Sequence, residues 1–205
     1  MTQREQRRAA DRERQAAEVL DVARSAFAGA GFSGASMKDI ATESGYSVGH
    51  IYNLIGNKAS LFDAVMLREG SRLADTIARA QAEHPDKPAA AIDAIIDSSL
   101  GFFDSHREFF EIYLRHAGGM RANVERVFSP QLVEIDRKIE KQMTRLFRQA
   151  AEAGLTAELS PSDMRTALSE LISGFLAAWA AAGYRGRVSR KAKVIKHLLW
   201  NGIRA

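Results

Sequence analysis

Apolar residues recur along this chain at spacings of three and four, which is the period of one face of an α-helix. No run of alternating β-branched residues is long enough to indicate a strand. The pattern therefore predicts an all-α protein built from helices with short connections. It is clearest in two stripes, Leu132, Ile135, Ile139, Met143, Leu146 and Ala150, and Met164, Leu168, Leu171, Phe175 and Trp179.

Two short helices joined by a glycine-bearing turn are predicted within residues 36–55. Ser36 and Ser47 are of the residue type that caps a helix N-terminus, and Gly45 is of the type that ends a helix. The second helix is too short to be stable alone, so it must pack against neighbouring helices. These are the proportions of a helix-turn-helix. The packing face consists of Val48, Ile51 and Ile55.

The opposite face of the second helix carries polar groups suited to DNA. His50 and Asn53 can form hydrogen bonds with base edges, and Gly49 allows close approach to a major groove. The Tyr52 hydroxyl is suited to phosphate, as are Ser36, Ser47 and Lys58, and Lys58 also lies at a predicted helix start. The helix proportions alone leave two interpretations open, a DNA-reading unit and an ordinary part of a helical bundle.

The residue pattern of this region resembles the N-terminal domain of the TetR family. The stretch from Ala30 to Phe62 has Ser36 followed by Ile40-Ala41, then Gly45, Tyr52 and Lys58 at the family's spacing, and the resemblance covers about residues 13–73. It departs from the family pattern at two positions. Leu54 replaces a His or Tyr that helps to hold phosphate, and Ile55 replaces Phe, which is a conservative core change.

The resemblance implies a three-helix helix-turn-helix domain, a larger helical domain for ligand sensing and dimerisation, and a two-fold dimer. It further implies a transcriptional repressor that a small-molecule inducer releases from a near-palindromic operator. Phosphate contacts are carried over to Ser36, Tyr52 and Lys58. Positions facing the groove are carried over to Lys38, Ser47, Val48, Gly49, His50 and Asn53.

Three segments are predicted along the chain. Residues 1–14 are polar and rich in arginine, and we expect a flexible arm. This arm either reaches DNA or remains a solvated tail that acidic residues partly neutralise. Residues 13–73 form the predicted DNA-binding domain, with the helix-turn-helix motif at 36–55, and residues 74–205 form the predicted ligand-sensing and dimerisation domain.

The middle of the chain is rich in aromatic residues, which favours an apolar ligand pocket between helices. The alternative is that these rings only fill the core. The candidate pocket residues are Phe102, Phe103, His106, Phe109, Phe110, Tyr113, His116 and Phe147.

Two helices near the C-terminus have broad apolar faces and small residues that permit close packing. The resemblance implies that they form a four-helix dimer interface, and packing within one protomer is the alternative. Such a dimer places its two reading helices about 34–36 Å apart, one turn of B-DNA. The candidate interface residues are Leu168, Leu171, Phe175, Trp179, Val194 and Leu198.

Composition narrows the class of protein further. The 205 residues include no cysteine, which excludes disulfides and thiolate metal sites. His106 and His116 lack metal-ligand spacing, and no nucleophile or phosphate-loop motif occurs, so neither a metal, a cofactor nor an enzyme is expected. No signal peptide or membrane span is recognisable, so a cytoplasmic protein with no membrane contact is expected.

The net charge of +4 is unevenly distributed. Residues 171–205 carry seven basic and no acidic side chains. Three interpretations of this basic end remain open: a solvated face that balances the acidic middle, contact with an anion or a membrane surface, and attraction of an acidic partner.

Overall fold

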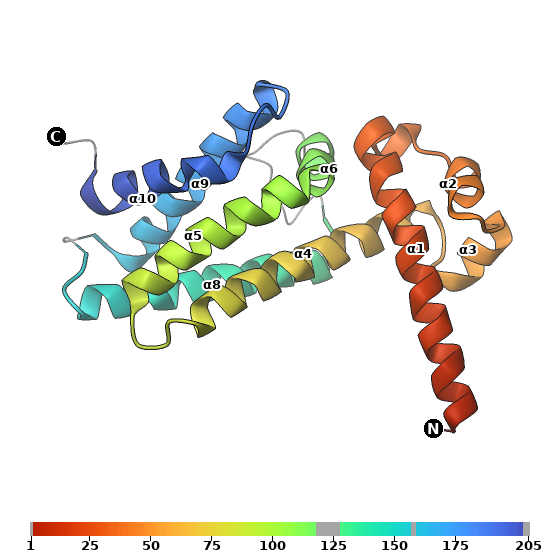
Figure 1. Cartoon of the computed structure of the whole chain (residues 1–205), viewed down its shortest axis with the longest axis horizontal. Helices are drawn as coiled ribbons and strands as arrows, with labels where there is room; N and C mark the ends of the chain where they lie inside the picture. The colour runs from red at the N-terminus through yellow and green to blue at the C-terminus, as the bar shows by residue number, and fades with distance from the viewer. Residues whose placement is uncertain (1, 118–127, 157–158, 203–205) are drawn as a thin grey trace. The chain divides into compact units, whose positions relative to one another are not determined.

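The computed structural model describes residues 2–117, 128–156 and 159–202, and within these ranges it consists of helices and turns without any strand (Figure 1). The all-α prediction is therefore confirmed. The elements are α1 (Gln3–Gly34), α2 (Met37–Ser44), α3 (Val48–Leu54), α4 (Lys58–Ala82), α5 (Pro88–Ser105), α6 (Arg107–Ala117), α8 (Pro130–Glu152), α9 (Pro161–Ala181), the 3₁₀ turn η1 (Val188–Lys191) and α10 (Ala192–Asn201).

The chain divides into two compact units, and each unit combines two separate stretches of the sequence. The first unit combines Met1–Glu69 with Glu108–Ser129, and the second combines Gly70–Arg107 with Pro130–Ala205. Almost all of α6 therefore belongs with the N-terminal helices. The functional boundaries at residues 13–73 and 74–205 stay a prediction.

The first unit is built on local capping signals and one small core. The Ser36 hydroxyl caps α2, and Gly45, with φ of 75°, takes the left-handed conformation that ends it. The Ser47 hydroxyl then caps α3. Ile40 and Ile51, one on each short helix, are fully buried. The second short helix thus stays folded by packing, as the sequence predicts.

Helix α1 begins at Gln3, within the predicted arm of residues 1–14, and its first part extends past α3 (Figure 1). The flexibility of this arm stays a prediction. The helix begins this early because of a capping box. The Thr2 hydroxyl accepts a hydrogen bond from the Glu5 amide, and the Glu5 carboxylate accepts one from the Thr2 amide at 2.7 Å. The residues that follow are mostly strong helix formers, which extend the helix from this start.

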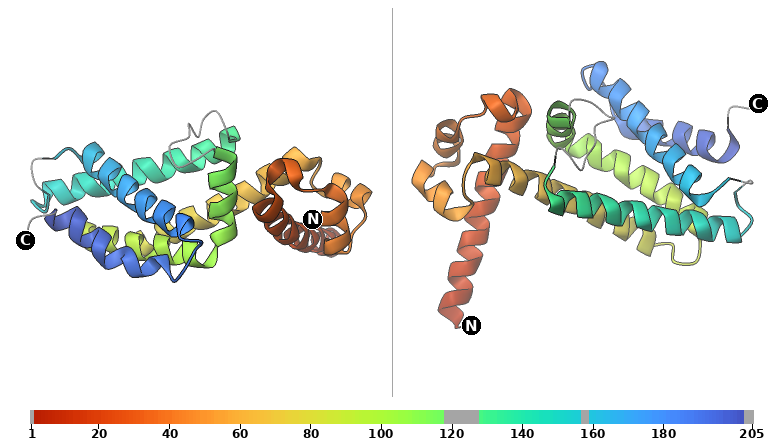
Figure 2. Two further views of the ribbon diagram at one scale, coloured as in Figure 1. Left: turned by 90° about the horizontal axis from the view of Figure 1, so that it is seen from above. Right: turned by 180° about the vertical axis from the view of Figure 1, so that it is seen from behind.

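The second unit packs α5, α8, α9 and α10 around an apolar core (Figure 2). Ile92, Leu100, Phe147 and Ile195 are among its fully buried side chains. The stripe predicted from the sequence forms much of the buried face of α8. Its residues Leu132, Met143, Leu146 and Ala150 are buried.

Two side chains of the basic C-terminal segment, Arg187 and Lys196, form ion pairs with acidic residues of α5. Lys196 forms an ion pair of 2.6 Å with Asp97, and the Arg187 side chain lies 3.3 Å from Asp104. Asp104 also accepts a hydrogen bond of 2.7 Å from the Val188 amide, at the start of η1. Part of the positive charge therefore balances acidic residues of the same unit. Among the described residues, no helix is both long and apolar enough to cross a membrane.

Candidate nucleic-acid interface

The helix α3 has one buried and one exposed side. Ile51 is fully buried, whereas Val48 and Ile55 are only half-buried. Tyr52 is 50% exposed and Asn53 is also exposed. A phenol and an amide on successive residues therefore reach solvent from a helix whose other side is fixed in the core.

Two predicted phosphate contacts, Ser36 and Ser47, are also helix caps. The Ser36 oxygen accepts a hydrogen bond from the Lys38 amide at 3.2 Å, and the Ser47 oxygen accepts one from the His50 amide at 3.1 Å. A hydroxyl that accepts in a cap still has its own O–H to donate. Each serine can therefore hold its helix and donate to a phosphate oxygen at the same time.

The two predicted lysines differ in their surroundings. Lys38 is exposed on the first turn of α2. Lys58 is half-buried; its ammonium donates to the Ser33 carbonyl at 3.1 Å and lies 5.0 Å from the centre of the Phe32 ring. Lys58 thus also joins the start of α4 to the end of α1, a role that its sequence position did not indicate.

Three α1 side chains at a spacing of three residues contact α3 and the turn before it. The Arg12 guanidinium donates to the Asn53 carbonyl at 3.0 Å. The Gln15 side-chain oxygen lies 3.2 Å from Nε2 of His50, and Glu18 accepts a hydrogen bond from the Tyr46 hydroxyl. Residues three apart share one face of a helix. We call Arg12, Gln15 and Glu18 the α1 ladder.

His50 is less free than the sequence prediction assumed. Its ring is half-buried and stacks on the Tyr46 ring, with the centroids 4.9 Å apart and the planes inclined by 14°. It borders a groove of about 300 Å³ between α1 and α3. The groove is lined by Arg8, Asp11, Arg12, Gln15, His50, Asn53 and Leu54.

The contact between Tyr46 and Glu18 shifts both titrations. The hydrogen bond from the Tyr46 hydroxyl, helped by the charge of Arg14, holds the pKa of Glu18 below its ordinary value. The same bond raises the pKa of Tyr46, because an ionised phenol has lost the proton that it donates to Glu18. Both groups are therefore in their bonding form around neutral pH.

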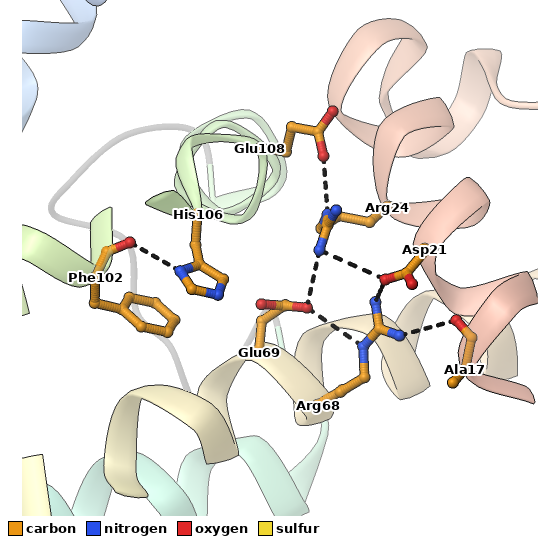
Figure 3. Close-up of polar contacts among 8 residues, drawn as sticks. All are labelled: Ala17, Asp21, Arg24, Arg68, Glu69, Phe102, His106 and Glu108. Carbon is orange, nitrogen blue, oxygen red and sulfur yellow. Dashed lines mark hydrogen bonds and ion pairs between the residues drawn. The ribbon is translucent and has the colours of Figure 1, made fainter. Parts of the chain in front are cut away.

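A second polar cluster joins α1, α4 and α6 inside the first unit (Figure 3). Glu69 is fully buried, and its carboxylate lies 3.5 Å from Arg24 and 3.3 Å from Arg68. Arg24 also donates to Glu108 at 2.8 Å, and Arg68 donates to Asp21 at 2.8 Å. We call these five residues the charge cluster.

Within the charge cluster, the Arg24 guanidinium remains ionised. Burial alone would lower the pKa of Arg24, but its hydrogen bond with Glu108 and the charge of Glu69 outweigh burial and raise it. Breaking a buried pair from one side is costly because it leaves a charge without compensation. The cluster therefore favours one arrangement of the three helices.

Helix α6 is fixed to the N-terminal helices at two further points. The Arg115 guanidinium donates to the Gly29 carbonyl at 3.3 Å. The His116 ring lies 4.4 Å from the Phe62 ring and 6.2 Å from the Phe32 ring. A movement of α6 would therefore change its contacts with α1 and with Phe62 near the start of α4.

The predicted pocket residues fall into both units. Phe102, Phe103 and Phe147 are buried in the second unit, where the half-buried His106 stacks on Phe102, with the ring centroids 4.0 Å apart. Nδ1 of His106 donates to the Phe102 carbonyl at 2.9 Å.

The other predicted pocket residues belong to the first unit, on α6. Phe109 and Phe110 are buried there. Tyr113 is half-buried and stacks on Phe128, with the centroids 5.3 Å apart, and His116 contacts Phe62 as described above. A ligand-binding role for the eight residues stays a prediction.

The predicted dimer residues divide by exposure. Leu168 and Trp179 are buried within the protomer, and the Trp179 indole donates to the Gly186 carbonyl at 3.0 Å. These two side chains fit the alternative of packing inside one protomer. Val194 is 44% exposed, and Leu171, Phe175 and Leu198 are half-buried.

Sequence reasoning missed the α1 ladder and the charge cluster. One signal for the cluster was present: Phe62, Val65 and Met66 form an apolar stripe on α4, and Glu69 continues it at a spacing of three. A carboxylate at a core position implies a cationic partner. No comparable local signal marks Gln15, whose contact with His50 depends on how α1 crosses α3.

Comparison with known proteins supports the family resemblance of the helix-turn-helix region. Residues 19–65 match the family model of the bacterial regulatory proteins of the tetR family. This range covers the second half of α1, both short helices and the start of α4. The search of curated proteins found no match.

Similar solved structures extend over nearly the whole chain. The fatty acid degradation regulator FadR from Bacillus halodurans has a TM-score of 0.80 and 18% identity, over 93% of this chain and 96% of its own. FadR from Bacillus subtilis, in complex with stearoyl-CoA, has a TM-score of 0.74 and 16% identity, over 91% and 98%.

A TetR-like regulator from Rhodococcus sp. RHA1 has a TM-score of 0.70 and 25% identity, over 94% of this chain and 95% of its own. These likenesses show the TetR fold, an N-terminal helix-turn-helix domain followed by larger helical parts. Taken with the family match over residues 19–65, they show that this chain has a TetR-type helix-turn-helix domain within a TetR fold.

Proposed function

We propose that this chain is a homodimeric, cytoplasmic repressor that binds a near-palindromic DNA operator and is released from it by a small-molecule inducer. The observation that carries the DNA-binding part is the exposed pair Tyr52 and Asn53 on α3, opposite the buried Ile51, within the stretch that matches the family model. A helix held in this way can enter a major groove with its polar side outward.

The contacts divide into those that position the protein and those that read sequence. The hydroxyls of Ser36 and Ser47 and the ammonium of Lys38 serve phosphates, which are the same in every sequence. The amide of Asn53 suits the N6 and N7 edge of adenine, where it can form two hydrogen bonds. Two such helices in a two-fold dimer read two half-sites about 34–36 Å apart.

The experiment that tests DNA binding begins with genomic fragments that the chain retains. The affinity for one retained fragment is then compared with that for a shuffled sequence of the same composition, over a range of salt concentrations. We expect tighter binding to the retained fragment at every salt concentration and a fall of affinity with salt for both, because phosphate contacts release counterions. Equal affinities for the two fragments would contradict the proposal.

The release mechanism acts through α6 and the charge cluster. An inducer that favours a different position of α6 would separate Glu108 from Arg24 and move the His116 ring away from Phe62. Arg24 lies on α1 and Phe62 on α4, the two helices next to the helix-turn-helix in the chain. A preference of about 1–3 kcal/mol per site is enough to lower DNA affinity by about fivefold or more. Because the five groups of the charge cluster are paired with one another, a partial displacement of α6 breaks ion pairs without forming new ones.

The aromatic residues of α5 and α6 favour a lipophilic inducer. The structural neighbour from Bacillus subtilis is in complex with stearoyl-CoA, so a long-chain acyl-CoA is the first probe, with free coenzyme A as its control. We expect the acyl-CoA alone to raise the melting temperature and to weaken operator binding. If neither the acyl-CoA nor a set of other lipophilic compounds changes either quantity, the ligand class is wrong while the DNA-binding proposal stands.

A further inference from the structure

The ring of His50, one of the predicted base-reading side chains, has two defined contacts in the structure. Nε2 lies 3.2 Å from the Gln15 side-chain oxygen, and one ring face stacks on Tyr46 at 4.9 Å. Tyr46 is itself held by its hydrogen bond to Glu18. The stack on Tyr46 therefore fixes the position of the imidazole, and the contact with Gln15 occupies its Nε2.

The Gln15 contact also determines the chemistry of the other nitrogen. An amide oxygen only accepts hydrogen bonds, so Nε2 of His50 must carry a proton to bind it. In the neutral ring the second nitrogen, Nδ1, is then without a proton and acts as an acceptor.

An acceptor in the major groove selects among bases. The exocyclic amino groups of cytosine and adenine are the donors there, whereas guanine presents only acceptors, N7 and O6. A neutral His50 with Nε2 bound to Gln15 thus matches cytosine or adenine. A doubly protonated ring would instead donate from Nδ1 and match guanine.

We propose that Gln15 and Tyr46 are positioning residues that set the base preference of His50, by fixing it as an acceptor for the amino group of cytosine or adenine. This inference rests on the proposed DNA-binding function of α3. It assigns a role in sequence recognition to α1, which carries Gln15, and to the turn that carries Tyr46.

The test is a selection of bound sequences from a random DNA library by the full-length chain and four variants. We expect the wild type to enrich cytosine or adenine about fivefold or more at one position in each half-site, since about fivefold is the lower end of the discrimination at a single recognised base pair. His50→Ala and Gln15→Met should both lose the enrichment at that position and keep it elsewhere. Gln15→Met preserves the length of the side chain and removes the acceptor.

The other two variants separate the ring stack from the hydroxyl. Tyr46→Phe keeps the stack on His50 and should keep the enrichment, whereas Tyr46→Ala should lose it. Enrichment of guanine at the position that depends on His50, or an unchanged preference in Gln15→Met, overturns this inference alone. A wild-type chain that enriches no sequence overturns the proposed function and this inference with it.

A second measurement needs no DNA. Nitrogen-15 spectra of histidine-labelled protein distinguish the two neutral tautomers of His50, once His50→Ala has identified its signals. We expect the proton on Nε2 in the wild type. A proton on Nδ1 overturns the inference whether or not the protein binds DNA.

Discussion

At the scale of single residues, we expect the exposed side chains of the helix-turn-helix to divide into those that read bases and those that bind phosphate. Asn53 is exposed on α3 and Lys38 is exposed on α2. The two side chains are comparable in exposure and differ in the contact that we assign to them. Substituting each by alanine therefore gives a matched pair of variants.

Asn53→Ala should weaken binding to the preferred sequence by about 1–3 kcal/mol and leave the salt dependence unchanged. Lys38→Ala should weaken binding to all sequences alike and reduce the slope of log affinity against log salt by about one, since one phosphate contact is lost. Fluorescence anisotropy titrations at several salt concentrations measure both. The reverse assignment of the two effects would contradict the interface.

The charge cluster predicts a large stability effect at one carboxylate and a small one at another. Glu69→Gln should lower the free energy of unfolding by about 3 kcal/mol, because it removes the one fully buried carboxylate that Arg24 and Arg68 share and leaves them only the more exposed Glu108 and Asp21. Asp21 is mostly exposed, so Asp21→Asn should cost less than about 1 kcal/mol. Urea denaturation of the two variants provides the comparison. Equal losses would mean that burial does not determine the strength of the cluster.

The contact between Glu18 and Tyr46 predicts a defined pH dependence. Glu18 has a lowered pKa in the folded chain, so its contribution to stability is present above its ordinary pKa and is lost as the pH falls through the lowered value. Tyr46 has a raised pKa, so its contribution is lost as the pH rises through the raised value.

In Tyr46→Phe, the pKa of Glu18 should rise toward its ordinary value, because the hydrogen bond is the largest cause of the shift. A carbon-13 titration of the side-chain carboxyl measures it. An unchanged titration of Glu18 would show that the phenol does not donate to it in solution.

At the scale of the element, the hydroxyls of Ser36 and Ser47 cap the two short helices, and we assign to them a second role in binding phosphate. Ser47→Ala removes both the cap of α3 and the O–H that we assign to phosphate, so it should cost about 1 kcal/mol of stability and also weaken DNA binding. Ser47→Asp keeps a capping oxygen but brings a negative charge to the phosphate. It should keep the stability and lose most DNA affinity, as measured by thermal melting and anisotropy. Retention of affinity in Ser47→Asp would remove Ser47 from the phosphate contacts.

The elements that could be predicted from the sequence are those whose signals are local. Ser36, Gly45 and Ser47 mark the ends of α2 and α3 within a few residues, and the stripe of α8 is visible at its own spacing. The start of α1 has a local signal as well, the capping box of Thr2 and Glu5, which the sequence prediction did not include. The α1 ladder could not be predicted, because Gln15 and His50 are 35 positions apart and only the folded chain brings them together.

At the scale of the whole molecule, the proposed dimer depends on apolar side chains that the protomer leaves accessible. Val194 on α10 is 44% exposed, and a charge there would be buried on dimerisation. Val194→Glu should therefore shift the chain toward monomer and abolish tight operator binding, because a single reading helix binds only one half-site. Sedimentation velocity at several concentrations measures the shift.

The control is Gln149→Glu, which makes the same change of charge at an exposed position of α8. It should leave the sedimentation of the chain unchanged. An unchanged oligomeric state in Val194→Glu would place the interface elsewhere or exclude a dimer.

Hydrogen–deuterium exchange of the full chain, with and without a retained DNA fragment, tests DNA binding by the helix-turn-helix most directly. We expect DNA to slow exchange of the backbone amides in residues 36–58, which include α2, α3 and the start of α4. Protection confined to residues 130–202, with residues 36–58 unchanged, would contradict it.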